Sequence, residues 1–372
     1  MNLRKTTVLC GALGLACAIT MAAVHDDAAP SAHAADIALP QVPRTVLVAT
    51  HPGAELTSVF FVDVHDTSPL APVSTFGHLP DATVQAVIVP GKTDVLATAD
   101  VTPTRDASFN AGLFYLRAHK PPERLVEGVV HASRPLVTPR GRVFVSRGKP
   151  GPDLEKALRV DSLTIDEVDV NTGQTRTVHR MDGYLSYLAG WFDHEIILYR
   201  IFPGRADIIA VDPDTHHERT VKKNFMPYAR DFSVDSTTGM LVFQNRDEQD
   251  PRTWVVDRLN LKDGTTERLF ASPGMSLSPY VVPGKGILYN PPGHGLSSLE
   301  GQIPIHGPLG SGVDVISAVS AQGRMLAGLH TQPSSFAVPF VVDTQSGAAR
   351  VLQAPANTRV VVAGFVADGG AP

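Results

Sequence analysis

The chain has 372 residues, of which 43% are hydrophobic and 19% charged, and its formal net charge is -5 at neutral pH. This is the composition of an ordinary globular protein with ample material for a core. A mildly negative chain lacks the basic surplus that general nucleic-acid or anionic-membrane binding needs, so we expect no nucleic-acid partner. The 31 glycines and 30 prolines favour a fold with many tight turns.

The N-terminal segment, residues 1–34, has the pattern of a signal peptide. Arg4 and Lys5 precede an uncharged apolar run over residues 6–24, and Ala32-His33-Ala34 supplies the small residues of a cleavage site. We therefore expect export to the periplasm or beyond the cell, with no transmembrane domain after cleavage. Two alternatives stay open: the apolar run remains as an uncleaved anchor, or Cys17 carries a lipid.

Both cysteines, Cys10 and Cys17, lie within the signal segment, so the mature chain is expected to hold no thiol and no disulfide. A mature fold of this kind depends on its core alone for stability. Cysteine nucleophiles and cysteine-bound metals are thereby excluded. The expected organisation is a signal peptide at 1–34, a linker at 35–43, one domain at 44–368 and a tail at 369–372.

Seven apolar runs, which follow one another at intervals of 40 to 53 residues, each stop at a single polar residue. The runs cover residues 46–50, 95–99, 143–146, 196–199, 240–245, 286–289 and 325–329, and the polar residues after them are His51, Asp100, Arg147, Arg200, Arg246, Asn290 and His330. Intervals of this size are typical of the four-stranded blade of a β-propeller.

A turn pattern supports the same repeat. An Asx residue is followed four positions later by glycine at 169–173, 260–264 and 343–347, and residues 212–216 fit this pattern with His216 in the glycine position. Such hairpins place glycine in the left-handed region after a type I turn. The best-formed unit spans residues 238–270 and predicts strands at 240–244 and 254–260 and a third strand that ends at Phe270.

The two ends of the repeat region complement each other. The last apolar run, residues 359–366, has no hairpin partner after it, whereas the first unit lacks a preceding strand. Pairing them closes a ring and removes two sheet edges. We predict an all-β fold, a β-propeller of seven four-stranded blades closed by the C-terminal strand in the first blade. Six or eight blades stay open as alternatives, because residues 290–316 are rich in glycine and proline. One helix is expected, at residues 153–159.

One unit carries a family resemblance. The stretch ARDFSVDSTTGMLVFQNRDEQDP, followed by RLNLKDGTTERLF, resembles the TolB-type, WD40-like propeller repeat of exported bacterial proteins. The likeness lies in the apolar strand, Arg246-Asp247 at its end, the following strand, and the glycine turn before Arg268-Leu269. The usual Ser-Pro-Asp-Gly turn of the family is replaced here by residues 234–239. The resemblance implies a propeller with a binding role and does not imply the partners of TolB itself.

The sequence favours neither a metal centre nor a serine-hydrolase site. Asp212, Asp214, His216, His217 and Glu218 form the densest cluster of potential metal ligands. In the repeat they fall on a surface hairpin, and we favour this structural interpretation over a metal site. No Gly-x-Ser-x-Gly pentapeptide occurs, and no residues are left for a separate α/β-hydrolase domain. No motif identifies a cofactor.

Equivalent loops of all blades emerge on one side of a propeller, so the seven polar residues should encircle one mouth of the central channel. Three successive blades present Arg147, Arg200 and Arg246, and Arg134 and Arg230 begin inner strands near them. We hypothesise that these arginines form an arc that binds an anionic ligand or an acidic protein loop. In the alternative, they pair with carboxylates of the same loops. Those carboxylates are Asp153, Asp207, Asp247 and Asp250.

Two functional classes therefore stay open. The first is a non-enzymatic binding or scaffolding propeller whose partner is a protein or a small anionic ligand. The second is a propeller enzyme, lactonase-like or lyase-like, with a metal site at the channel mouth built from His51, Asp100, Asn290 and His330. Because no motif supports catalysis, the binding protein is favoured.

Overall fold

The computed structural model describes residues 43–64, 69–103, 109–149, 162–181, 185–273, 277–291, 295–299, 303, 312–320, 322–332 and 335–366. Their regular elements are the strands β1 to β27. The expected signal peptide and the expected helix at 153–159 lie outside the described residues. Within the described part of the chain, no helix is long and apolar enough to cross a membrane.

The first sheet joins the two ends of the described chain. Its strand order is β27 (Arg359–Phe365), β1 (Thr45–Thr50), β2 (Leu56–Val62) and β3 (Ser74–Gly77). β27 pairs antiparallel with β1 along its whole length, from Thr50 opposite Arg359 to Thr45 opposite Phe365. The predicted closure by the C-terminal strand is confirmed, and it covers an edge that β1 would otherwise expose.

The next sheet has eight strands in two groups. The first group is β4 (Gln85–Ile88), β5 (Val95–Asp100), β6 (Ala111–Leu116) and β7 (Glu123–Val129). The second group is β8 (Leu136–Val137), β9 (Val143–Lys149), β10 (Ser162–Val168) and β11 (Thr175–Met181). One residue pair, Val129 of β7 with Arg147 of β9, joins the two groups.

Four further sheets follow in chain order, and all their pairings are antiparallel. One contains β12 (Leu185–Phe192), β13 (Glu195–Phe202), β14 (Arg205–Val211) and β15 (Glu218–Phe225). The next contains β16 (Arg230–Asp235), β17 (Met240–Arg246), β18 (Thr253–Asn260) and β19 (Thr266–Pro273). A three-stranded sheet contains β20 (Tyr280–Val282), β21 (Gly286–Tyr289) and β22 (Ser297–Ser298). The last contains β23 (Val313–Val319), β24 (Met325–Thr331), β25 (Val338–Asp343) and β26 (Ala349–Val351).

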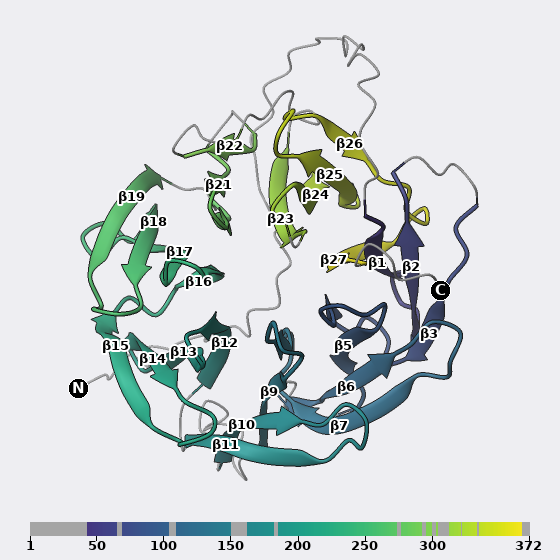
Figure 1. Ribbon diagram of the computed structural model, residues 1–372, viewed down its shortest axis with the longest axis horizontal. Helices are drawn as coiled ribbons and strands as arrows, with labels where there is room; N and C mark the ends of the chain where they lie inside the picture. Colours follow the sequence, from purple (N-terminus) through teal and green to yellow (C-terminus); the bar gives the residue numbers. More distant parts are fainter. Residues whose placement is uncertain are drawn as a thin grey trace, which may run out of the picture. The chain divides into compact units, whose positions relative to one another are not determined.

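The sheets follow one another around a common centre, with β12, β16, β23 and β27 on the central side (Figure 1). Successive sheets touch through their inner strands: β4 packs on β27, β16 on β12, β20 on β16, and β23 on β27. The seven predicted apolar runs form equivalent strands, β1, β5, β9, β13, β17, β21 and β24. We call the end of the sheets at which these seven strands end the mouth.

The core lies between neighbouring sheets. β1, β5 and β6 are buried at every position, because both faces of these strands are covered. One apolar cluster, for example, joins Ile197 and Tyr199 of β13 to Leu241 and Phe243 of β17 in the next sheet. Burial of one such side chain contributes on the order of 1.5–3 kcal/mol. The uninterrupted apolar runs are therefore the residues that hold sheet to sheet.

The predicted Asx hairpins are present at the end of the sheets opposite the mouth. Gly173, Gly264 and Gly347 have φ values of 69°, 74° and 73°, and His216 reaches 61° in the same position. At Gly264 the turn is closed by its backbone N–H, which donates to Asn260 O at 2.9 Å. A Cβ added to Gly264 would lie 2.3 Å from Val221 O, so the position also lacks room for a side chain. His216 tolerates the left-handed region as expected.

Polar side chains in or directly after five of the seven equivalent strands form hydrogen bonds with the segment that leads into the next sheet. The Thr98 hydroxyl of β5 donates to Ser133 O at 2.9 Å, and the Ser146 hydroxyl of β9 donates to Ser186 O at 3.1 Å. Three more sheets have comparable links. They are Ala229 N–H to the Tyr199 hydroxyl at 3.1 Å, Leu277 N–H to Gln244 Oε1 at 2.7 Å, and Asp314 N–H to Asn290 Oδ1 at 3.0 Å.

Candidate functional site

Two of the predicted arginines at the mouth are bound to carboxylates. Arg147 Nη1 lies 2.7 Å from Asp166 Oδ2 of the neighbouring strand. Arg200 Nη1 lies 3.0 Å from Glu218 Oε1, and its Nη2 lies 3.7 Å from Asp207 Oδ2. Both arginines therefore pair with carboxylates of their own sheets, and of these three carboxylates the alternative interpretation had named Asp207.

The other expected carboxylates have different partners. Of the four carboxylates that the alternative interpretation named, Asp207 pairs with a predicted arginine, Arg200. Asp247 pairs with Arg268, Asp250 pairs with Arg252, and Asp153 lies outside the described residues. The loop carboxylates near Arg246 are thus engaged by other arginines.

Arg246 and Arg230 lie against one aromatic ring. The guanidinium carbons of Arg230 and Arg246 are 4.2 and 4.0 Å from the centroid of Trp254. Trp254 lies directly opposite Arg246 in the β17–β18 pairing and is 7% exposed. Burial lowers the pKa of Arg246, and the charge of Arg230 lowers it further. Two like charges therefore share one indole at the mouth.

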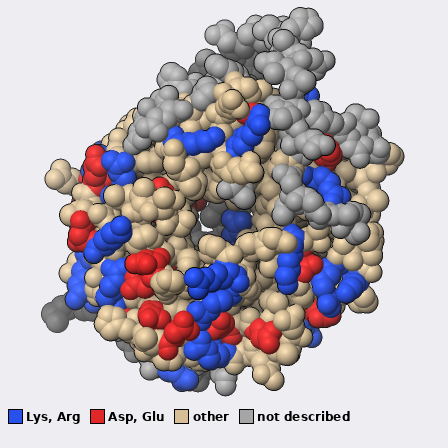
Figure 2. Space-filling view, in the orientation of Figure 1, with Lys and Arg blue, Asp and Glu red and all other residues tan. Residues whose placement is uncertain are grey.

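Arg134 reaches across the ring. Its Nη1 donates to Ser317 O of β23, the inner strand of the last sheet, at 3.3 Å. The side chain is exposed, yet the protein that surrounds its charge lowers the pKa of Arg134. Figure 2 shows an opening at the centre of the face in view, with charged side chains of both signs around it. Arg134 thus links the segment before β8 to the inner strand of the last sheet.

Asp100 and His51, at the ends of β5 and β1, have separate surroundings. Asp100 Oδ1 lies 2.9 Å from Nδ1 of His131, and this hydrogen bond raises the pKa of His131. Its Oδ2 accepts the N–H of Thr83 at 3.4 Å. His51 is exposed, and its carbonyl closes a turn with Ala54 N–H at 3.1 Å. These hydrogen bonds connect Asp100 and His51 to different parts of the chain.

Asn290 and His330 meet through Asp314. Asp314 N–H donates to Asn290 Oδ1 at 3.0 Å, and Asp314 Oδ1 lies 2.7 Å from His330 Nδ1. All three are at least 96% buried, with exposures of 4% for Asn290, 3% for Asp314 and 4% for His330. The second nitrogen of His330 lies 3.2 Å from Gln332 Nε2. This network ties two sheets together, and its polar atoms are already bonded to one another.

The proposed metal quartet is therefore divided. Asn290 and His330 share one buried network, Asp100 belongs to another, and His51 lies in an exposed turn. Among the described residues, no group of three or more His, Cys, Asp or Glu side chains is placed to hold a metal ion.

The sequence cluster at 212–218 forms a hairpin at the end opposite the mouth. The Asp212 carboxylate accepts the N–H of Asp214 at 2.8 Å, which lowers the pKa of Asp212. Asp214 pairs with Arg142 of another sheet at 2.9 Å, and His216 Nδ1 lies 2.6 Å from Val178 O. Hairpin formation and links between sheets account for these ligand-type residues.

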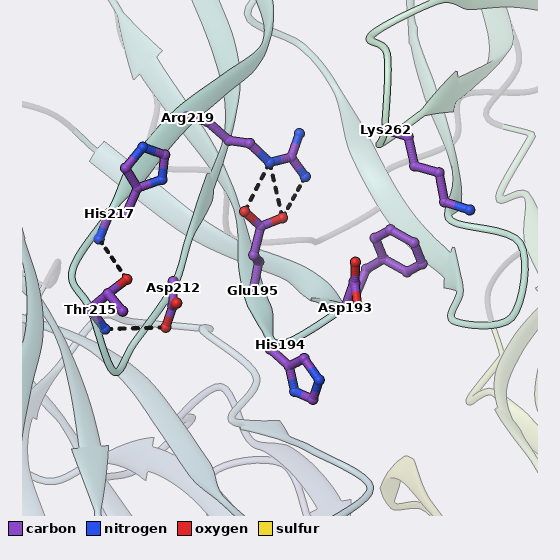
Figure 3. A pocket seen from close by; sticks show the side chains of 9 residues that line it. Asp193, His194, Glu195, Asp212, Thr215, His217, Arg219 and Lys262 are labelled. Carbon is purple, nitrogen blue, oxygen red and sulfur yellow. Dashed lines mark hydrogen bonds and ion pairs between the residues drawn. The ribbon is translucent and has the colours of Figure 1, made fainter.

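A shallow cleft of about 560 Å³ lies beside this hairpin. Its lining residues are Phe192, Asp193, His194, Glu195, Asp212, Thr215, His217, Arg219 and Lys262. Figure 3 shows the carboxylate of Glu195 against the guanidinium of Arg219, where Nε lies 2.8 Å from Oε1. The cleft is at the opposite end of the sheets from the mouth. Within it, the charges of Glu195 and Arg219 neutralise each other.

The sequence analysis missed Trp254, Asp314 and Tyr228. Trp254 is one of two tryptophans in the chain and is the second residue of β18, the strand after Arg246, which was a usable signal. Asp314 joins Asn290 to His330 from a strand whose register the sequence does not specify. Tyr228 is 52% exposed in the link between β15 and β16, and sequence alone does not distinguish it from a core tyrosine.

No family model matches the sequence, and no curated protein matches it. Solved structures do match. TolB from Acinetobacter baumannii superposes with a TM-score of 0.50 at 11% identity, over 87% of this chain and 67% of that one. A structure of prolyl endopeptidases superposes with a TM-score of 0.53 at 12% identity, over 86% of this chain. This chain spans 50% of the prolyl endopeptidase chain. At such identities these likenesses concern the fold alone: the chain has a propeller-like fold of several four-stranded antiparallel sheets.

Proposed function

We propose that this chain is an exported, non-enzymatic propeller that binds a protein partner through its mouth. One observation carries the proposal. The described residues contain five large apolar side chains that are exposed, and all five lie toward the mouth. They are Leu56 (59%), Tyr228 (52%), Phe336 (41%), Val338 (36%) and Val351 (55%).

Their positions follow from the strand order. Leu56 begins β2 and Val338 begins β25, each directly after a loop of the mouth, and Phe336 lies in the second of these loops. Val351 ends β26 opposite Phe340, near the start of β25. Because all five side chains are exposed at the same end of the sheets, we take this end as the interaction surface.

The charged residues of the mouth fit the same proposal. Protein interfaces are enriched in aromatic residues and arginine. The Arg230–Trp254–Arg246 group supplies both kinds of side chain. The chain as a whole is mildly negative, with a formal net charge of -5. We therefore favour a protein partner over a nucleic acid.

The experiment is site-specific photo-crosslinking in the cells that produce the protein. A photoreactive residue in place of Phe336 should capture one discrete partner, whereas the same residue in place of His194, at the opposite end, should capture none. Phe336→Glu should then weaken binding of the purified partner, measured by calorimetry, at least about tenfold. Equal capture from both ends, or capture from neither, would contradict the proposal.

The export part of the proposal rests on residues 1–34 and is tested separately. A reporter fused to the first 40 residues should leave the cytoplasm, and N-terminal sequencing of the mature protein should begin at Ala35. A mature protein that begins at Cys17, or a membrane-bound protein that keeps Met1, would replace the soluble exported form by an anchored one.

We also propose that the ring has seven blades. Support comes from the eight-stranded sheet, whose two four-stranded groups are joined by the single pair Val129 and Arg147. Counting these groups separately accounts for all seven apolar runs. An experimental structure of the mature chain should show seven radial sheets, and a continuous ladder between β7 and β9 would reduce the number to six.

A further inference from the structure

Arg230 and Arg246 form a positively charged pair on the indole ring of Trp254. The guanidinium carbons lie 4.2 and 4.0 Å from the indole centroid. Both side chains are half-buried, and Trp254 is 7% exposed. The ring holds the two arginines by cation–π contacts, which restrict their rotamers before any ligand binds.

Few of the hydrogen-bond donors of these arginines are used. Arg246 Nη1 donates to Arg252 O at 3.2 Å. Arg230 Nε is buried and has no hydrogen-bond partner among the described residues. No carboxylate of the described residues lies within ion-pair distance of either guanidinium, whereas Arg147 and Arg200 at the same end have such partners.

The acidic residues that follow the two arginines in the sequence, Asp231 and Asp247, do not fill this role, and Asp247 pairs with Arg268. Asp231 follows Arg230, but its carboxyl group accepts a hydrogen bond from Nε2 of Gln244. Burial raises the pKa of Asp231, and the nearby charge of Arg230 acts in the opposite direction. Asp231 is therefore hydrogen-bonded by Gln244, and among the described residues it forms no ion pair with Arg230.

We propose that Arg230 and Arg246 bind carboxylate groups of an acidic segment of the protein partner. The inference rests on the proposed function and names the chemistry that the partner presents. Guanidinium groups bind carboxylates with paired, charge-assisted hydrogen bonds. An incoming carboxylate would also relieve the repulsion between the two like charges. Tyr228, exposed in the link that leads to Arg230, adds an apolar contact for the same segment.

The test uses Trp254 as its own reporter. The chain has two tryptophans, and Trp191 stacks on Phe144 at a centroid distance of 5.8 Å. Trp191→Phe keeps an aromatic ring there and leaves Trp254 as the sole indole. An oligoglutamate peptide, added at low ionic strength, should change the Trp254 fluorescence saturably. An oligoglutamine peptide of equal length should not.

Matched arginine variants locate the site. Arg246→Met and Arg230→Met should each weaken oligoglutamate binding about tenfold or more. Arg252→Met is the control, because Arg252 lies in the same loop, is 91% exposed and pairs with Asp250. It should bind as the parent does. Arg246→Lys, which keeps the charge and loses the paired donors, should fall between these variants and covers the case in which a methionine variant fails to fold.

The outcomes separate this inference from the proposed function. If oligoglutamate leaves Trp254 unchanged, or if Arg252→Met loses as much affinity as Arg246→Met, the carboxylate site is overturned. A partner captured at Phe336 would still support the proposed function in that case. If the peptide binds as expected and Phe336 captures nothing, the anion site stands and the apolar docking surface does not.

Discussion

Asn290 binds both backbone groups of Asp314. Its carboxamide donates to Asp314 O and accepts the N–H of Asp314 at 3.0 Å. Asn290 follows β21 and Asp314 belongs to β23, so one side chain joins two successive sheets as a neighbouring strand would. The Asp314 carboxylate then binds His330 Nδ1 at 2.7 Å. A residue that sequence analysis placed in a possible catalytic quartet is thus part of the link between sheets.

Asn290→Ala should destabilise the protein by about 2–4 kcal/mol, because it leaves a buried N–H and a buried carbonyl of Asp314 without partners. Urea unfolding of the mature protein measures the change. Asn171→Ala is the control, since Asn171 is exposed in a turn, and it should change the stability by less than about 0.5 kcal/mol. Equal effects of the two substitutions would show that the Asn290 link contributes little.

Asp100→Asn should destabilise the protein more at low pH than at high pH. The hydrogen bond to Asp100 raises the pKa of His131 above its ordinary 6.5. A raised pKa in the folded state adds stability that is fully present below pH 6.5 and is lost as the pH rises through the folded value. Urea unfolding at about pH 5.5 and about pH 9 measures the difference. His131→Gln, which cannot titrate, should remove the pH dependence of the Asp100→Asn effect, and persistence of that dependence would assign it to another group.

Much of the fold could be predicted from sequence because blade strands are buried on both faces. Continuous apolar runs then mark them directly, as at β1 and β5. The left-handed turn positions were equally readable, since glycine or a tolerant residue such as His216 must occupy them. Closure of the ring was also predictable. In the sequence, no hairpin partner follows β27 and no strand precedes β1, so the two strands could complete each other's sheet.

The site was less predictable because its chemistry depends on strand register. Arg200 and Arg246 lie near the ends of the equivalent strands β13 and β17 and look alike in sequence. Asp207 lies opposite Arg200 across the sheet, whereas Trp254 lies opposite Arg246. The first arginine is therefore ion-paired and the second stacks on an indole. Loop length decides this register, and apolar periodicity does not report it.

Deletion of residues 359–372 should abolish cooperative folding. β27 buries Val360, Val362 and Ala363, and it contributes to the apolar clusters on both sides of the first sheet. Each buried valine contributes on the order of 1.5–3 kcal/mol, so the loss is comparable with the stability of a domain. Thermal unfolding followed by circular dichroism measures it. Deletion of residues 367–372 alone, which keeps the strand, is the control and should melt as the full mature chain does.

Gly264→Ala should destabilise the protein by more than Gly204→Ala. Both glycines have left-handed backbones, with φ values of 74° and 76°, so alanine costs about 1 kcal/mol at either position. At Gly264 the added Cβ would also lie 2.3 Å from Val221 O, whereas at Gly204 it meets nothing within 4 Å. Urea unfolding should rank the two variants in this order, and the reverse order would show that the hairpin at 260–264 moves to accept a side chain.

Arg200→Glu and Arg246→Glu should have opposite consequences for stability, although sequence analysis placed both arginines in one arc. Arg200→Glu puts a third carboxylate beside Glu218 and Asp207, of which Asp207 is 5% exposed, and should destabilise the protein by about 3 kcal/mol. Arg246→Glu removes a like charge from the neighbourhood of Arg230 and places a carboxylate there, so its change should stay within about 1 kcal/mol. Urea unfolding at low and high salt measures both, and salt should reduce the Arg200→Glu penalty. A large loss from Arg246→Glu with little change from Arg200→Glu would show that Arg246 is the structural arginine and Arg200 the one available to a partner.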